Sequence, residues 1–168
     1  FDGREVHTSL GRRIADIAAE GLPIEPWVAF ARNVYANPFK EAREELYDFL
    51  ERSNLPITED GCFVAFKWVN GNYRDCFSDT FDNRIGQIIE MPREEVDPVR
   101  SNHCSTGFHF CSYNYLQNFS GKHIMIVKIN PADVVSIPDD YDYAKGRTCR
   151  YEVIGEVPEE RLPNWEWD

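Results

Sequence analysis

The chain has 168 residues, a formal net charge of −11 and 42% hydrophobic residues. This length suits one domain, or one domain with a small appendage, and the hydrophobic content supports a packed core rather than a disordered chain. Because carboxylates outnumber basic side chains 29 to 18, a surface that binds nucleic acid through its phosphates, or adheres to an anionic membrane, is disfavoured. Apolar runs such as residues 124–127 are too short to cross a bilayer, so the sequence predicts no membrane span.

The first third of the chain carries helical patterns. One apolar face precedes Gly21, which should end a first helix, and a short second helix is predicted to start at Pro26. Asn37 and Pro38 are typical of the N-cap and first turn of a third helix. The apolar stripe of this helix consists of Phe39, Ala42, Leu46, Phe49 and Leu50. We therefore predict a helical N-terminal subdomain over residues 1–55.

From residue 56 the pattern changes to strands. The almost continuously apolar segment 62–69 predicts a buried central strand. Further strand candidates are residues 86–90, 107–111, 123–129, 134–137 and 147–157. We predict an α+β fold in which a mainly antiparallel sheet domain at 56–157 follows the helices, with an acidic tail at 158–168. The core should centre on Phe63, Phe66, Trp68, Ile126, Val127 and Val153.

The five cysteines are odd in number and include no CxxC pair. In a chain of this length we expect reduced, mostly buried thiols, which fits the cytoplasm. His103, Cys104, His109 and Cys111 form the densest group of zinc-type ligands, but their spacing lacks the two close pairs of a structural zinc site. We predict no disulfide, metal or other cofactor. A nucleophilic pair of Cys104 or Cys111 with His109 or His123 is an alternative that the residue types leave open.

Known catalytic and nucleotide-binding motifs are not found, including GxGxxG, the P-loop, GxSxG and HExxH. No catalytic residue can therefore be named from the sequence. The candidate site for a partner or an anion consists of His109, Lys145, Arg147, Arg150 and Glu152. Basic groups and a titratable histidine gather there in an acidic chain, so an anionic group would be attracted to them. Arg150 and Glu152 should share one face of the last strand, opposite Cys149, Tyr151 and Val153. The alternative is that the basic residues pair with the acidic run at 139–142.

Four long blocks resemble the successive signature blocks of rIIB-type proteins, which occur in T-even and many other tailed phages. These blocks are residues 55–69 (LPITEDGCFVAFKWV), 73–97, 104–116 and 130–154. The helical segment that leads into the first block also fits, so the resemblance covers about residues 1 to 157.

The resemblance implies a viral early accessory protein with an rIIA-type phage protein or a host protein as partner; a homo-oligomer is a further alternative. In the family such proteins are associated with lysis timing and with resistance to host exclusion at the membrane. The location expected is the host cytoplasm, or the inner membrane surface through a partner. T-even members carry a helix-turn-helix-like N-terminal segment that this sequence does not contain, so DNA contact is not carried over. The chain begins with Phe1 rather than Met, and we expect a preceding region in the natural protein.

The order of the elements also resembles the core of ADP-ribosyltransferase-like folds. A strand with His109, a helix, the strand at 123–129 and a late strand with Tyr151 and Glu152 follow one another in that order. Those folds use a first-strand Arg or His and a late Glu around NAD, whereas the first strand here offers Lys67. The resemblance therefore implies a degenerate core, and an NAD-binding or ADP-ribosyltransferase-like enzyme is the alternative function.

Overall fold

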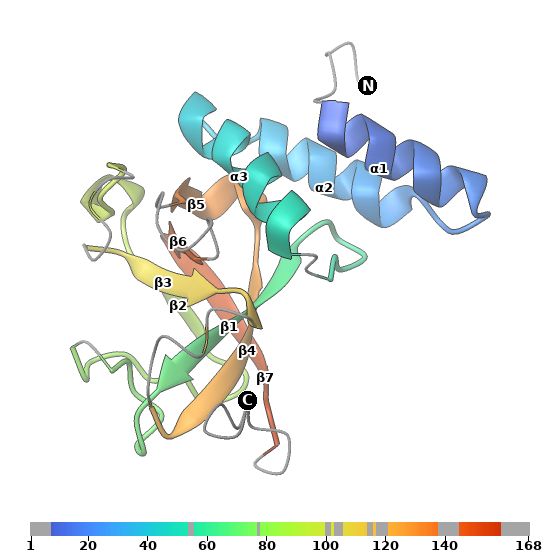
Figure 1. Cartoon of the computed structure of the whole chain (residues 1–168). Helices are drawn as coiled ribbons and strands as arrows, with labels where there is room; N and C mark the ends of the chain where they lie inside the picture. Colours follow the sequence, from blue (N-terminus) through green and yellow to red (C-terminus); the bar gives the residue numbers. More distant parts are fainter. Residues whose placement is uncertain are drawn as a thin grey trace.

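The computed structural model has an α+β fold, which confirms the predicted fold class. It describes residues 8–53, 56–76, 78–99, 102, 106–113, 116, 121–137 and 145–158. Within these residues the helices are α1 (Thr8–Ala19), α2 (Glu25–Tyr35) and α3 (Lys40–Ser53). The strands are β1 (Phe63–Val69), β2 (Ile88–Glu90), β3 (Phe108–Cys111), β4 (His123–Ile129), β5 (Val134–Ser136), β6 (Lys145–Thr148) and β7 (Arg150–Glu156). Figure 1 shows the helices packed together above one end of a curved sheet.

The sheet has the strand order β2-β7-β4-β1-β3-β6-β5, and each pair in the described part of the chain is antiparallel. Only Cys149 separates β6 from β7, yet three strands lie between them in this order. In a flat sheet they would be about 19 Å apart, at roughly 4.8 Å per strand. The sheet must therefore curl until its two halves meet at Cys149.

The prediction of one long strand over residues 147–157 is wrong in this respect, because the range is divided between β6 and β7. At Cys149 the backbone N–H donates to Asp133 O (3.1 Å), while the carbonyl accepts from Met91 N (2.9 Å). These two neighbours belong to opposite ends of the strand order, so the chain changes partners within one residue. At Cys149 the chain leaves β6, which belongs to one half of the curled sheet, and enters β7, which belongs to the other half.

The described core residues form three clusters, of which the two around β1 lie on opposite faces of the sheet. The inner face, which we define as the face that contacts the helices, carries Phe63, Val127 and Val153. There the ring of Phe49 from α3 packs edge-on against those of Phe63 and Phe110, with centroids 5.9 and 5.5 Å away. Edge-on pairs of this kind add about 0.5–1.5 kcal/mol each beyond the area that they bury.

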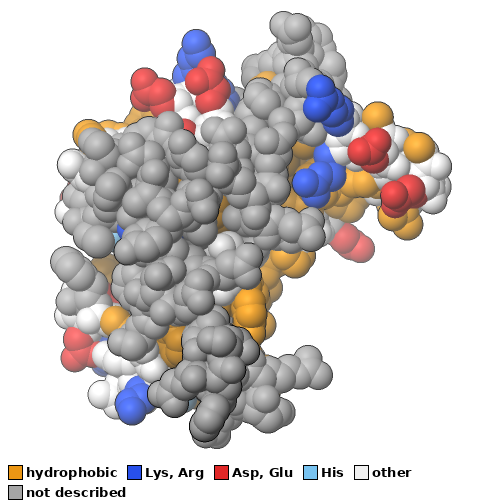
Figure 2. All heavy atoms as spheres, viewed as in Figure 1, with side chains coloured by type: hydrophobic (Ala, Val, Ile, Leu, Met, Phe, Trp, Pro, Cys, Tyr) orange, Lys and Arg blue, Asp and Glu red, His pale blue; other side chains and the backbone are white. Residues whose placement is uncertain are grey.

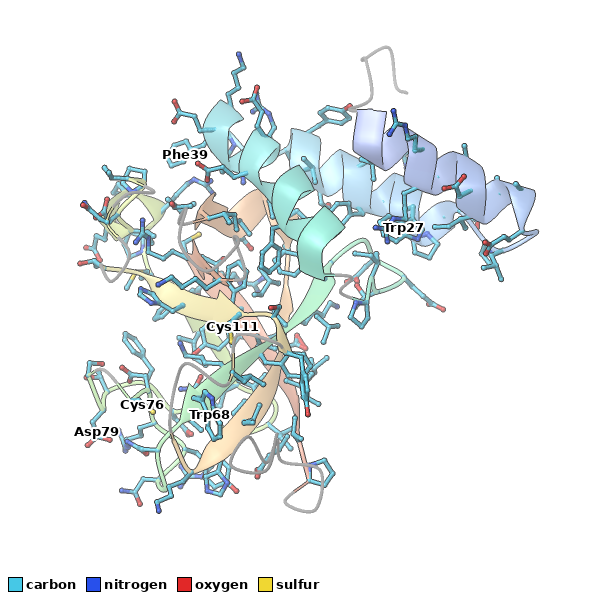
Figure 3. The ribbon with its side chains drawn as sticks, in the orientation of Figure 1. Trp27, Phe39, Trp68, Cys76, Asp79 and Cys111 are labelled. Carbon is cyan, nitrogen blue, oxygen red and sulfur yellow. The ribbon has the colours of Figure 1, made fainter. Side chains whose placement is uncertain are left out.

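The opposite, outer face of the sheet carries the other predicted core residues, Phe66 and Trp68 on β1 and Ile126 on β4, in a separate cluster with Cys111 and Leu116. Trp68 Nε1 donates to Leu116 O at 2.8 Å, which satisfies the one polar group of that indole. Figure 3 shows Trp68 and Cys111 on neighbouring strands of the sheet. The six predicted core residues are therefore divided between two clusters.

Buried polar side chains attach the helices to the β5 edge of the sheet. Asn37, which is fully buried, donates from Nδ2 to Pro131 O (2.9 Å) and to Val134 O (2.7 Å). Its Oδ1 accepts from Phe39 N (2.9 Å) and from an Arg93 guanidinium N–H (2.8 Å). The helix α3 begins at Lys40, later than predicted, since its first backbone bond runs from Arg43 N to Phe39 O (3.1 Å), and the Asn37 amide bonds to the sheet. Residues 54–55, where the sequence predicts the boundary between subdomains, lie outside the described residues, as does most of the predicted tail.

Asn37→Ala should lower the free energy of unfolding by about 2 kcal/mol, because it removes the bonds to Pro131 O and Val134 O and leaves Val134 O with the Arg93 donor alone. Asn72→Ala is the matched control: Asn72 is exposed, and surface substitutions usually stay within about 0.5 kcal/mol. Urea denaturation of both variants, followed by circular dichroism, measures the difference. Equal midpoints for the two variants would show that Asn37 does not join the helices to the sheet.

Candidate functional site

The five predicted site residues lie on different strands and in different environments. His109 is on β3, Lys145 and Arg147 are on β6, and Arg150 and Glu152 are on β7. His109 is the cross-strand partner of Arg147, and Lys145 is that of Cys111. The bend at Cys149 separates this group from the β7 residues.

Arg147 is fully buried and acts inside the protein. Its guanidinium donates to Val99 O at 2.6 Å, to Asn102 O, and to Ser136 Oγ at 3.2 Å. These bonds attach Val99 and Asn102 to β5 and β6. Charge-assisted bonds to carbonyl oxygens are among the stronger hydrogen bonds in proteins, so Arg147 has a structural role that its sequence position does not reveal.

His109 and Lys145 are also enclosed to a large extent. Lys145 is 4% exposed, and His109 is half-buried. The carbonyl of His109 accepts a hydrogen bond from Lys67 Nζ at 2.8 Å. The predicted basic patch is therefore mostly packed on β3 and β6, and the acidic run at 139–142 lies outside the described residues.

Arg150 and Glu152, in contrast, point outward from β7. Cys149, Tyr151 and Val153 are buried while Arg150 is exposed and Glu152 is half-buried, which confirms the predicted alternation. Arg150 Nε lies 3.5 Å from Glu90 Oε2 on β2, and these side chains are 47% and 69% exposed. Of the predicted residues, these two are therefore the ones that a large partner could reach.

Two exposed isoleucines lie near Arg150 and Glu152. Ile88, 49% exposed, is the cross-strand partner of Glu152, and Ile154, 41% exposed, lies two residues after Glu152 on β7, at the register shift between Val153 and Gly155. We call this surface the β2–β7 face, and it consists of Ile88, Glu90, Arg150, Glu152 and Ile154. Figure 2 shows hydrophobic side chains exposed on the flank of the molecule below the helices, in a view in which β2 lies behind β3. The β2–β7 face thus combines apolar contact area with charges of both signs.

The residues that the NAD alternative requires do not share one face. Lys67 lies on the inner side, where its Nζ is 5.7 Å from the centre of the Tyr151 ring. Burial lowers the pKa of this ammonium. Tyr151 donates its hydroxyl to Asn83 Oδ1, whereas Glu152 points to the outer side and lies opposite Lys128 on β4. Glu152 and Lys67 are therefore not directed at a common ligand.

Sequence reasoning missed a cluster of side chains at the start of β4, around His123. The rings of Tyr73 and His123 stack with centroids 4.0 Å apart and an interplanar angle of 14°. His123 Nδ1 lies 3.0 Å from Glu156 Oε2, and the hydrogen bond to Glu156 raises the pKa of the Tyr73 hydroxyl. Arg84 lies 5.6 Å over the Tyr73 ring. The sequence signal was weak, because Tyr73, with a φ of +60°, lies outside the helices and strands that periodicity can predict.

Metal and membrane features can be assessed for the described residues. No group of three or more His, Cys, Asp or Glu side chains is placed there to hold a metal ion. His103 and Cys104, from the predicted zinc-type group, lie outside the described residues. Cys62, Cys111 and Cys149 are buried thiols, and burial raises the pKa of the Cys111 thiol to about 12. No helix in the described part of the chain is long and apolar enough to span a bilayer.

Comparison with known proteins assigns the family. The sequence matches the family of the bacteriophage T4 protein rIIB over residues 1–161. The chain belongs to this family. It is 44% identical over 162 residues to protein rIIB of Enterobacteria phage T4. This alignment covers 95% of the chain but 52% of the relative, so the chain spans about half the length of the T4 protein. No solved structure matches, and the resemblance predicted from the signature blocks is confirmed.

Proposed function

We propose that this rIIB-family chain acts by protein–protein contact in the infected cell, as part of a phage accessory protein. The process is the timing of lysis and the counteraction of host exclusion or defence systems. The partner is an rIIA-type phage protein or a host protein, met in the host cytoplasm or at the inner membrane through that partner. The observation that carries the proposal is the β2–β7 face, an exposed apolar and charged surface on a chain of this family.

The composition of the β2–β7 face suits protein contact. Interfaces commonly have an apolar centre and a polar rim, and Arg is enriched in them. Ile88 and Ile154 supply the apolar area, while Arg150 and Glu90 supply the charges. An exposed ion pair such as Arg150–Glu90 adds only about 0–1 kcal/mol to stability. Folding therefore does not require this pair, and its charges are accessible to a partner.

Charge reversal on this face tests the proposal. Phage that carry Arg150→Glu should lose growth on a host that restricts rII-defective phage, and keep normal growth on a permissive host. The purified variant should keep its melting temperature within a few degrees, because an exposed pair contributes little to folding. Glu152→Lys should have the same effect on growth.

The control is Lys40→Glu, which reverses one charge of the exposed Lys40–Glu44 pair on α3, at 3.9 Å. This variant should grow on both hosts. Normal growth of Arg150→Glu and Glu152→Lys on the restrictive host would show that the β2–β7 face is not the contact surface.

A further inference from the structure

The two edge strands of the curled sheet, β5 and β2, differ in whether side chains bond to their backbone groups. At the β5 edge, Val134 O accepts from Asn37 Nδ2 (2.7 Å) and from an Arg93 guanidinium N–H (2.8 Å). Ile137 N, just after β5, donates to Glu45 Oε2 at 2.9 Å. Proteins commonly cover edge strands in this way, because open backbone groups would pair with another chain. The β5 edge is therefore closed by side chains from the helical part and from Arg93.

The β2 edge is open in the described part of the chain. Met91 N donates to Cys149 O, and Val153 N donates to Gln87 O, both at 2.9 Å. Hydrogen-bonded pairs alternate along an antiparallel ladder. The backbone N–H and C=O groups of Ile89 therefore point toward β7. The N–H and C=O groups of Ile88 and Glu90 then face away from β7. No described side chain bonds to them, in contrast to the bonds at β5.

Side chains next to this edge indicate the chemistry of what it binds. Ile85 and Ile88 are 61% and 49% exposed, so apolar area lies beside the open backbone groups. Glu90 is 69% exposed, and Glu94 and Glu95 follow it on the surface. An added strand would thus meet isoleucines and carboxylates, and a segment with apolar and basic side chains complements both.

A second copy of the chain fits this edge poorly. In antiparallel self-pairing about Ile89, each Ile88 would lie opposite Glu90 of the other copy, so an apolar side chain would face a carboxylate. The acidic groups of the two copies would also repel each other, since each chain carries a net charge of −11.

We propose that the open edge of β2, residues 88–90, binds an extended, basic and apolar segment of a partner protein as an added strand. The inference rests on the proposed function, since it names how the β2–β7 face meets its partner. Main-chain hydrogen bonds to Ile88 and Glu90 provide the pairing, and Glu90 selects basic side chains.

The probe is a short, fluorescently labelled synthetic peptide in which Val and Lys alternate, and binding to the purified chain is measured by fluorescence anisotropy. Two matched peptides serve as controls, one with Glu in place of Lys and one with alternate backbone nitrogens methylated. The Val–Lys peptide should bind, and both controls should bind at least about tenfold more weakly, the effect of about 1.4 kcal/mol. Equal binding of the methylated peptide would overturn the proposal, because strand addition needs its N–H groups.

Variants of the chain locate the edge. Ile88→Pro removes the N–H that faces away from β7 and leaves the inner ladder, since proline is tolerated on edge strands. It should weaken binding of the Val–Lys peptide roughly tenfold, whereas Ile88→Thr, which keeps the N–H, should weaken it less. Should Ile88→Pro fail to fold, Glu90→Lys replaces it and should shift the preference toward the Val–Glu peptide. Unchanged preference in Glu90→Lys, or equal binding by Ile88→Pro and wild type, would contradict the proposal.

The growth assay separates this inference from the proposed function. If Arg150→Glu abolishes growth on the restrictive host but the wild-type chain does not bind the Val–Lys peptide, the contact surface stands and strand addition is wrong. If the peptide binds as expected but the Arg150, Glu152 and Ile88 variants all grow normally, the edge binds a strand and the proposed function fails.

Discussion

Gly61→Ala should lower the free energy of unfolding by about 4 kcal/mol, the largest effect that we expect of a single methyl group in this protein. Gly61 has a φ of +79°, and a Cβ there would lie 2.3 Å from the carbonyl carbon of Ala29 and 2.4 Å from Phe30 N. Both contacts are backbone atoms of α2, so no side chain can rotate away to make room. The left-handed backbone costs about 1–2 kcal/mol for a residue other than glycine, and the close approach to α2 adds the rest.

Gly21→Ala separates the two contributions. Gly21 has a similar φ of +75°, but a Cβ there would meet nothing within 4 Å. This variant should therefore cost only about 1–2 kcal/mol, and urea denaturation of both variants gives the difference. If the two variants lose the same stability, the loop before β1 does not pack against α2 as closely as the structure shows. Should Gly61→Ala fail to fold, Asn33→Ala tests the same contact, because Asn33 Nδ2 donates to Asp60 O (3.0 Å) and Gly61 O (2.9 Å).

The sequence pattern predicted an element well where a single apolar face or a single apolar run defines that element. The strand at 123–129 has the predicted bounds, because its apolar residues are continuous and a glycine precedes it. The strand at 62–69 was predicted to within one residue for the same reason. Asn37 was predicted as an N-cap on residue type, but its side chain bonds to residues 131 and 134, nearly a hundred positions away. No local pattern contains such a partner.

The bend at Cys149 shows the same limit at the level of topology. Alternation along residues 149–153 predicted correctly which side chains are buried. It could not show that the segment before Cys149 pairs with β3 and the segment after it with β4. Strand partners depend on contacts far apart in the sequence, whereas periodicity reports only which side of a strand is apolar.

Only part of the candidate site was predicted, because the type of a residue does not reveal whether the fold buries it. Basic residues are expected at the surface, so Lys145, Arg147 and Arg150 were treated alike. The structure buries Arg147, which bonds to Val99 O and Asn102 O, and leaves Arg150 exposed. The stacked Tyr73 and His123 were missed because they lie fifty positions apart and have no joint motif.

Arg147→Ala should lower the free energy of unfolding by about 3 kcal/mol, whereas Arg150→Ala should change it by less than about 1 kcal/mol. The first substitution removes a buried guanidinium and leaves Val99 O and Ser136 Oγ without that donor. Arg147→Lys should recover only part of the loss, because an ammonium cannot reproduce the planar fork of the guanidinium. Thermal and urea denaturation of the three variants, at equal protein concentration, provide the measurement.

The different effects of Arg147 and Arg150 on stability decide which variant can test the β2–β7 face. A double variant at Arg147 and Arg150 would lose activity through unfolding even if neither residue touched a partner. Arg150 alone separates contact from stability, since it is 47% exposed and its pairing with Glu90 adds little to folding. If Arg147→Ala proved as stable as wild type, the bonds from its guanidinium to Val99 O and Asn102 O would not contribute to folding. The buried arginine would then return to the set of residues whose substitution reports on partner binding.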